Sequence, residues 1–246
     1  MENSMDTLNS LAHGWLPLFM THMLESSLFI MLIYAADRIF VLDTRRRYTL
    51  WLLGLVKLFL PPVITVGMPE AVPAPVQQFL PAVLLPAVSS QPGPVTNLTP
   101  AGLLFILWSI IVLATVAVIL YKNRQLNQRL ADSQPVDQKA IISSTMRLPE
   151  KLQIFLTNAL PTPLVKGVLR PRLYVPREHL RLPQQQRHSI LAHELAHLNS
   201  FDIPALYLQA LAIILFGSNP LVWLLHRRLV YLRELRCDET AMAQTG

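Results

Sequence analysis

Long apolar segments dominate the first half of this chain of 246 residues. They cover residues 15–36, 50–67 and 102–121, and each is close to the roughly 20 residues that cross a bilayer core as a helix. A fourth apolar segment, 203–225, is interrupted by the sequence Gly217-Ser218-Asn219-Pro220. The pattern predicts three transmembrane helices and a fourth segment of a different kind.

After residue 121 charged residues return, and the pattern becomes that of a small folded domain. Residues 164–168 and 172–175 are expected as two short strands bounded by prolines, with Gly167 in a turn or bulge. From Pro183 the run QQQRHSILAHELAHLNS has helical composition and no interior glycine or proline. A helix is therefore expected to carry its histidines.

Composition and charge support a membrane protein with a defined orientation. The chain is 52% hydrophobic and 15% charged, against roughly 25% charged in soluble domains. Of its 21 Lys and Arg residues, none precedes Arg38 and none lies between Lys57 and Lys122. By the positive-inside rule the N-terminus and the proline-rich loop 68–100 are outside, and everything from residue 122 is cytoplasmic. The net charge of +6 thus reflects topology, and we expect no direct nucleic acid binding.

These observations predict a multi-pass protein of the cell membrane, mainly α-helical, in two domains. Residues 1–121 form the membrane domain, and residues 122–246 form a cytoplasmic domain with a short strand region. The single cysteine, Cys237, excludes an internal disulfide and fits a reducing compartment.

The sequence His193-Glu194-Leu195-Ala196-His197 is the strongest chemical signal in the chain. On a helix, positions i and i+4 lie one above the other, so both imidazoles can bind one zinc ion. Glu194 lies beside this pair, where it can activate a water molecule. A catalytic zinc site needs a third protein ligand and an open position.

The third ligand has to come from further along the chain. The downstream candidates share a metal-binding side chain: they are Asp202, His226, Glu234, Cys237, Asp238 and Glu239. Asp202 is expected to act as N-cap of the following helix, with support of the metal site as the alternative.

A helical hairpin at 203–243 brings the favoured candidate to the histidines. Residues 203–216 span only about 21 Å as helix, less than the roughly 30 Å bilayer core, and Pro220 suits the start of a returning helix. The hairpin is expected to dip into the lipid and return. Glu234 and Asp238, at i and i+4, then share a face as ligand and as hydrogen-bond partner of a bound imidazole. Cys237 remains an alternative ligand, and Glu239 is expected to point away.

HELAH, a hydrophobic hairpin with SNPLVWLL, and RELRCDE together resemble the membrane metallopeptidase family of the BlaR/MecR-type antibiotic sensor-transducers. PTPLVKGVLRPRLYVP resembles the strand region before the zinc helix of that family. The best-known members continue into an external penicillin-binding sensor, whereas this sequence ends at Gly246. The resemblance therefore implies the protease chemistry for this sequence, and we do not extend the expectation to antibiotic sensing.

The resemblance implies a gluzincin-type site: His193, His197 and Glu234 as zinc ligands, Glu194 as general base and Asp238 as support. It implies cleavage of a cytoplasmic regulator such as a transcriptional repressor, or of the protease itself. The substrate is expected to lie along an edge strand, 164–168 or 172–175. Two alternatives stay open, a heat-shock or prenyl-type membrane protease and a non-catalytic transducer in which zinc joins two helices.

Three ionisable residues fall within the apolar segments: His22, Glu25 and Lys57. Such residues are functional suspects in a membrane. A structural polar contact between helices is an equally good interpretation, so no catalytic role is assigned to them. Trp15 and Trp51 are expected to be interfacial anchors.

Overall fold

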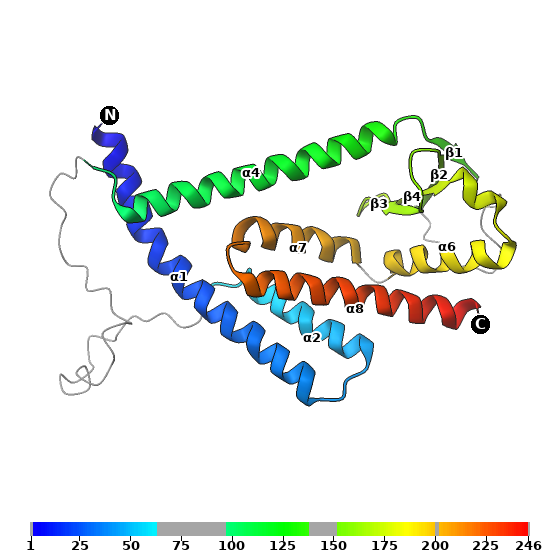
Figure 1. The fold of residues 1–246 in the computed structure, drawn as a ribbon, viewed down its shortest axis with the longest axis horizontal. Coiled ribbons are helices and arrows are strands. Elements are labelled where there is room, and N and C mark those ends of the chain that lie inside the picture. Colours follow the sequence, from blue (N-terminus) through cyan, green and yellow to red (C-terminus); the bar gives the residue numbers. More distant parts are fainter. Residues whose placement is uncertain (1, 63–96, 138–151, 200–201, 246) are drawn as a thin grey trace. The chain divides into compact units, whose positions relative to one another are not determined.

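The computed structural model describes residues 2–62, 97–137, 152–199 and 202–245 (Figure 1). The chain divides into two compact units. The first comprises Met1–Glu25 and Leu60–Ile110, and the second comprises Ser26–Phe59 and Ile111–Gly246. Helices α1 (Glu2–Ile39) and α4 (Pro100–Arg129) each contribute to both units.

Aromatic rings and one asparagine hold the first unit together. Trp15 of α1 lies 5.3 Å from the Phe105 ring and 5.1 Å from the Trp108 ring of α4. The side-chain oxygen Oδ1 of Asn9 accepts hydrogen bonds from the Thr99 amide and hydroxyl, and the Thr99 hydroxyl accepts one from the Gly102 amide. These bonds satisfy donors at the start of α4, where a helix has no backbone partners for them.

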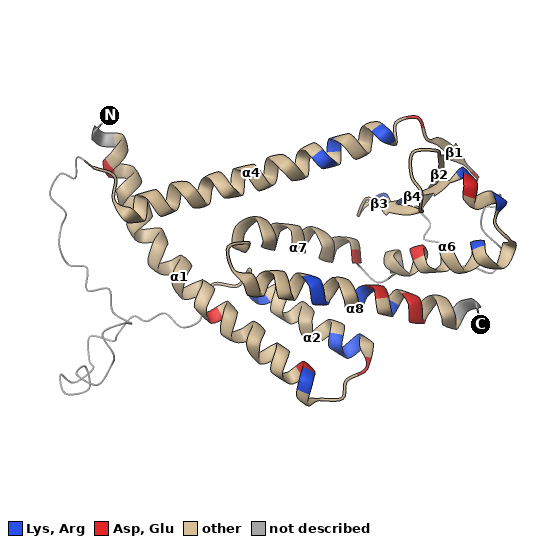
Figure 2. Ribbon diagram, viewed as in Figure 1, with Lys and Arg blue, Asp and Glu red and all other residues tan. Residues whose placement is uncertain are grey.

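Two of the three expected spans are helices long and apolar enough to cross a membrane, by length and composition. They are Ser4–Ile39, with 36 residues, and Pro100–Arg129, with 30 residues. Figure 2 shows no charged residue in the first part of α4, with basic residues toward its end. These two helices support a membrane protein.

The expected second span, 50–67, is not confirmed as predicted. Helix α2 covers Thr44–Lys57 and has 14 residues. It begins before the apolar segment and includes Thr44 and the three arginines that follow it. Residues 63–67, and most of the expected exterior loop 68–100, lie outside the described residues.

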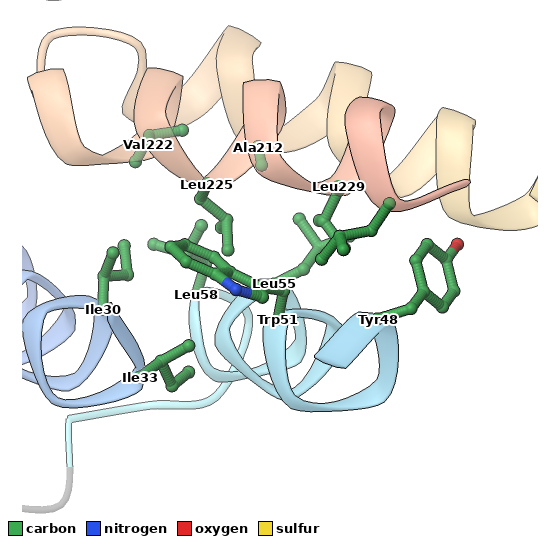
Figure 3. Close-up of a cluster of buried hydrophobic side chains, with 11 residues drawn as sticks. Ile30, Ile33, Tyr48, Trp51, Leu55, Leu58, Ala212, Val222, Leu225 and Leu229 are labelled. Atoms are coloured by element: carbon green, nitrogen blue, oxygen red, sulfur yellow. The ribbon is translucent and has the colours of Figure 1, made fainter. Parts of the chain in front are cut away.

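Helices α1, α2, α7 (Asp202–Phe216) and α8 (Pro220–Thr245) form the main core of the second unit. Trp51 of α2 is fully buried there, among residues that include Ile30, Ile33 and Leu225 (Figure 3). The expectation that Trp51 is an interfacial anchor is therefore wrong. A tryptophan in an apolar run fits either place, and only the neighbouring helices decide between them.

Helices α7 and α8 form the expected helical hairpin. Its turn follows Phe216, whose carbonyl accepts a hydrogen bond from the Asn219 amide at 2.9 Å. The Asn219 side chain accepts a hydrogen bond from the Leu221 amide at 2.9 Å, which satisfies a free donor at the start of α8. The structure thus has the two helices and the turn that the hairpin requires, and the depth of the hairpin in a bilayer stays a prediction.

A four-stranded sheet precedes the helix with the histidines. Its strands are β1 (Gln134–Val136), β2 (Gln153–Thr157), β3 (Leu164–Lys166) and β4 (Arg172–Pro176), in the order β1-β2-β4-β3. β2 and β4 are parallel, and the other two pairs are antiparallel. β3 ends before Gly167, whose φ of 95° turns the chain as expected. β4 has a strand on each side, so the expectation that 172–175 offers a free edge is wrong.

The sheet packs against helix α6 (Gln184–Asn199), which follows the short helix η2 (Arg177–Arg181). Ile154 of β2 and Leu173 of β4 are buried in one cluster with Leu191 and Leu195 of α6. Because Leu191 and Leu195 are one turn apart, they mark the face of α6 that meets the sheet. Glu194 and His197 lie on other faces of the helix.

Replacing Trp51 by alanine should destabilise the protein by about 3–5 kcal/mol, because a large side chain is removed from a closed core. Thermal unfolding of the purified protein in detergent measures this as a lower melting temperature. Leu53→Ala is the control, since Leu53 lies on the same helix with 54% of its surface exposed. Equal melting temperatures for the two variants would contradict the burial of Trp51.

Candidate metal centre

Two helices supply the candidate ligands. α6 carries His193 and His197 one turn apart, with ring centroids 5.0 Å from each other. α8 returns along α6 and presents Glu234 and Asp238, also one turn apart. The i, i+4 spacing places each pair on one face of its own helix. The packing of α8 against α6 brings the two faces together.

One carboxylate oxygen of Glu234 lies close to both imidazoles. Its Oε2 atom is 3.5 Å from His193 Nε2 and 3.8 Å from His197 Nε2. Three ligand atoms placed about 2.0–2.1 Å from a tetrahedral zinc ion would be about 3.4 Å apart. His193, His197 and Glu234 thus form a group that fits a metal ion, as the sequence predicts.

The second nitrogen of each imidazole faces an acidic side chain. His193 Nδ1 is 2.9 Å from Asp238 Oδ1, and His197 Nδ1 is 3.1 Å from Asp202 Oδ2. A carboxylate at Nδ1 favours the tautomer with its proton there, which leaves Nε2 free as a metal ligand. Both histidines are therefore oriented for one shared ion.

Asp202 is the partner of His197 and belongs to a buried polar cluster. It is 1% exposed, and its carboxylate also contacts the Tyr48 hydroxyl, the Arg236 guanidinium and the Cys237 thiol. The favoured expectation for Asp202 was an N-cap of the next helix. Asp202 does begin α7, but its described side-chain contacts are those of the alternative, support of the metal site.

Cys237 lies on the far side of the His197 ring from Glu234. Its sulfur is 3.2 Å from His197 Nδ1, whereas Glu234 approaches Nε2. Burial raises the pKa of the Cys237 thiol to about 12, and the negative charge of Asp202 adds to that increase. His197, Asp202 and Cys237 do form a second group with metal-binding atoms, but a protonated thiol is a poor ligand. The geometry favours Glu234 over Cys237.

Glu194 has the environment expected of a proton acceptor beside a metal. Burial raises the pKa of its carboxyl above the ordinary value, while His197 and His193 oppose that increase. A carboxyl whose pKa is raised toward neutral suits general base catalysis.

The remaining downstream candidates contact other groups. Glu239 accepts a hydrogen bond from the Thr44 hydroxyl at 2.6 Å, which fits the expectation that it points away from the histidines. His226 pairs with Gln209 of α7 at 3.1 Å. Neither belongs to the three-residue group that could hold an ion.

Sequence reasoning did not find Tyr48 and Arg236. Tyr48 precedes Asp202 by 154 positions, and nothing in its local pattern relates it to the histidines. In the sequence, Arg236 is identified only as part of the motif RELRCDE. Its position two residues after Glu234, beside Asp238, was the one available signal.

A family model described as BlaR1 peptidase M56 matches residues 17–245. The chain therefore belongs to this family of metallopeptidase-like membrane proteins, and the resemblance seen in its motifs is confirmed. The family implies a metal ion, typically zinc, and the group His193, His197 and Glu234 fits one.

The chain is similar to the regulatory protein BlaR1 of Bacillus licheniformis. The two are 26% identical over 140 residues, which is 54% of this chain and 23% of that protein. This chain thus spans less than a quarter of the relative's length.

Purified protein should contain about one zinc ion per chain, and His193→Ala or His197→Ala should lose it, because a catalytic site with two protein ligands binds zinc weakly. Metal analysis after dialysis measures the content. His188→Ala, on the same helix, is the control and should keep its zinc. Full zinc content in both site variants would rule out this metal centre.

Proposed function

We propose that this protein is a zinc-dependent membrane endopeptidase. One observation carries the proposal: two imidazole Nε2 atoms converge on one oxygen of Glu234, and a carboxylate holds the other nitrogen of each ring. A site that only needed to join two helices would have no use for Glu194 beside the ligands. The intact pattern of base and ligands therefore favours catalysis over a purely structural zinc.

The roles of the side chains follow from their chemistry. Zinc, when bound, supplies a Lewis acid that polarises a peptide carbonyl and lowers the pKa of water to about 7. Glu194 accepts the proton as water adds to the carbonyl carbon, and then transfers it to the leaving amine. His193, His197 and Glu234 hold the ion, while Asp238 and Asp202 keep the two rings oriented.

Substrate is proposed to bind along β3. Among the described strands β3 has one neighbour, β4, so its other edge offers free backbone groups. β3 also lies against α6, which carries the histidines. An extended peptide can add to such an edge through backbone hydrogen bonds, which tolerate many sequences. Lys166 is the last residue of β3, and its ammonium group donates a hydrogen bond to the Asn123 side chain of α4 at 2.8 Å.

We infer that the substrate is a cytoplasmic regulator, such as a transcriptional repressor, or the protein itself. The family and the name of the relative point to regulation, and the apolar helices point to a bilayer. No observation favours a heat-shock or prenyl-type protease. A non-catalytic transducer remains the alternative that the next experiment separates.

Glu194→Gln should retain zinc and lower the rate of peptide cleavage by about 10²–10⁴-fold, because the amide cannot accept the proton. The test is a zinc-dependent cleavage assay on the purified protein, with metal analysis of the same sample. Glu178→Gln is the control, since Glu178 is an exposed glutamate of η2. A Glu194→Gln protein that cleaves at the wild-type rate would contradict the role of Glu194 as general base. Absence of zinc-dependent cleavage by the unmodified protein would leave only the non-catalytic role.

The proposed topology places the metal centre on the cytoplasmic side, because basic residues are concentrated there. A cysteine introduced at Pro92 should react in intact cells with a membrane-impermeant thiol reagent, and one introduced at Gln185 should react only after lysis. The unmodified protein gives the background, which should be low because Cys237 is buried. The reverse labelling pattern would invert the topology.

A further inference from the structure

The Asp202 carboxylate has more contacts than a helix cap needs. One oxygen, Oδ2, faces His197 Nδ1 at 3.1 Å. The other, Oδ1, faces the Tyr48 hydroxyl at 3.3 Å and is also contacted by the Arg236 guanidinium. The carboxylate is therefore held at both oxygens, with the histidine on one side and the tyrosine and arginine on the other.

These partners come from three different helices. His197 belongs to α6, Tyr48 to α2, and Arg236 to α8. Tyr48 is 4% exposed, so its hydroxyl is directed into the protein interior and needs a hydrogen-bond acceptor there. Asp202 provides it. The contact is therefore a buried link from α2 to a carboxylate that touches a metal ligand.

Tyr48 also acts on the other partner of Asp202. The Arg236 guanidinium carbon lies 4.1 Å from the centre of the Tyr48 ring, which is within range of a cation–π contact. The ring thus holds Arg236 against Asp202, while the hydroxyl binds Asp202 directly. A single residue of α2 restrains the carboxylate by two routes.

We propose that Tyr48 is a positioning residue of the metal centre, linking helix α2 to His197 through Asp202. The proposal rests on the zinc site proposed above. Free rotation of the carboxylate would let the His197 ring turn, and the Nε2 atom would lose its alignment with Glu234. Groups that orient a metal ligand in this way affect metal affinity although they do not touch the ion.

The test measures zinc affinity by competition with a chelator, using the full chain in detergent. Tyr48→Phe removes only the hydroxyl and leaves the ring under Arg236. The loss of one hydrogen bond should weaken zinc binding about 2- to 10-fold. Tyr34→Phe is the matched control, because it removes the hydroxyl of another tyrosine whose ring lies near an arginine, with the Arg38 guanidinium carbon 5.4 Å from the ring centre. This variant should keep wild-type affinity.

A double-mutant cycle tests whether Tyr48 acts through Asp202. Asp202→Asn should weaken zinc binding about tenfold or more. Adding Tyr48→Phe to Asp202→Asn should then have little further effect, because the carboxylate that transmits it is already gone. A general loss of packing would instead lower the affinity of the double variant by the product of the two single effects.

Wild-type zinc affinity in Tyr48→Phe, or two effects that multiply in full, would overturn the proposal. Neither result touches the proposed function, because the zinc content of His193→Ala and the cleavage rate of Glu194→Gln test that separately. If His193→Ala bound zinc normally, the zinc site itself would fail, and this failure is distinguishable from a failure of Tyr48 alone.

Discussion

The packing of α8 against α6 is the contact on which the candidate metal centre depends. HExxH on α6 places two imidazoles on one face of a helix, but two ligands are not enough for catalytic zinc. α8 brings the proposed third ligand, Glu234, to the histidines because the chain turns back after Phe216 instead of continuing straight. A continuous helix from 203 to 225 would have carried Glu234 away from His197. The short α7, with 15 residues, and the Asn219 cap therefore allow the turn that brings Glu234 back to the histidines.

A second constraint is that each imidazole has two nitrogens, and the one that does not bind metal must be held. The two rings meet this need differently. His193 faces Asp238, whose side chain is 59% exposed, whereas His197 faces Asp202, which is almost fully buried. A buried carboxylate needs partners that compensate for lost water, and Tyr48 and Arg236 supply them. The His197 side of the centre is therefore the side that depends on the rest of the fold.

The predictable and unpredictable parts of this structure differ in the range of the interactions that decide them. The spacings His193 to His197 and Glu234 to Asp238 are local, and a helix converts such spacing directly into a shared face. The hairpin also followed from a local argument, since its first helix is too short to cross a bilayer and a turn sequence ends it. The sequence pattern likewise located β3 and β4 between their prolines.

The errors concern residues whose environment is built by distant segments. Trp51 suits a membrane interface and a protein core equally well, and packing of α1, α2 and α8 around it decides for the core. The edge position of a strand depends on its neighbours, and β2 occupies the side of β4 that was expected to be free. Asp202 lies at the start of a helix, and this local position alone predicts a capping role. Its contacts with Tyr48 and Arg236 come from distant segments, which the local pattern does not show.

The buried position of Asp202 also bears on how a membrane protein of this family can control a metal site. Its carboxylate contacts α6, α8 and α2, and α2 follows directly on α1, one of the two candidate spans. Tyr48 and Trp51 lie one turn apart on the same helix and both belong to the apolar core, while the Tyr48 hydroxyl also reaches Asp202. Because both are buried, α2 cannot shift without disturbing either the core or the carboxylate that orients His197. The same packing that stabilises the helices therefore joins α1, a candidate span, to the proposed zinc site.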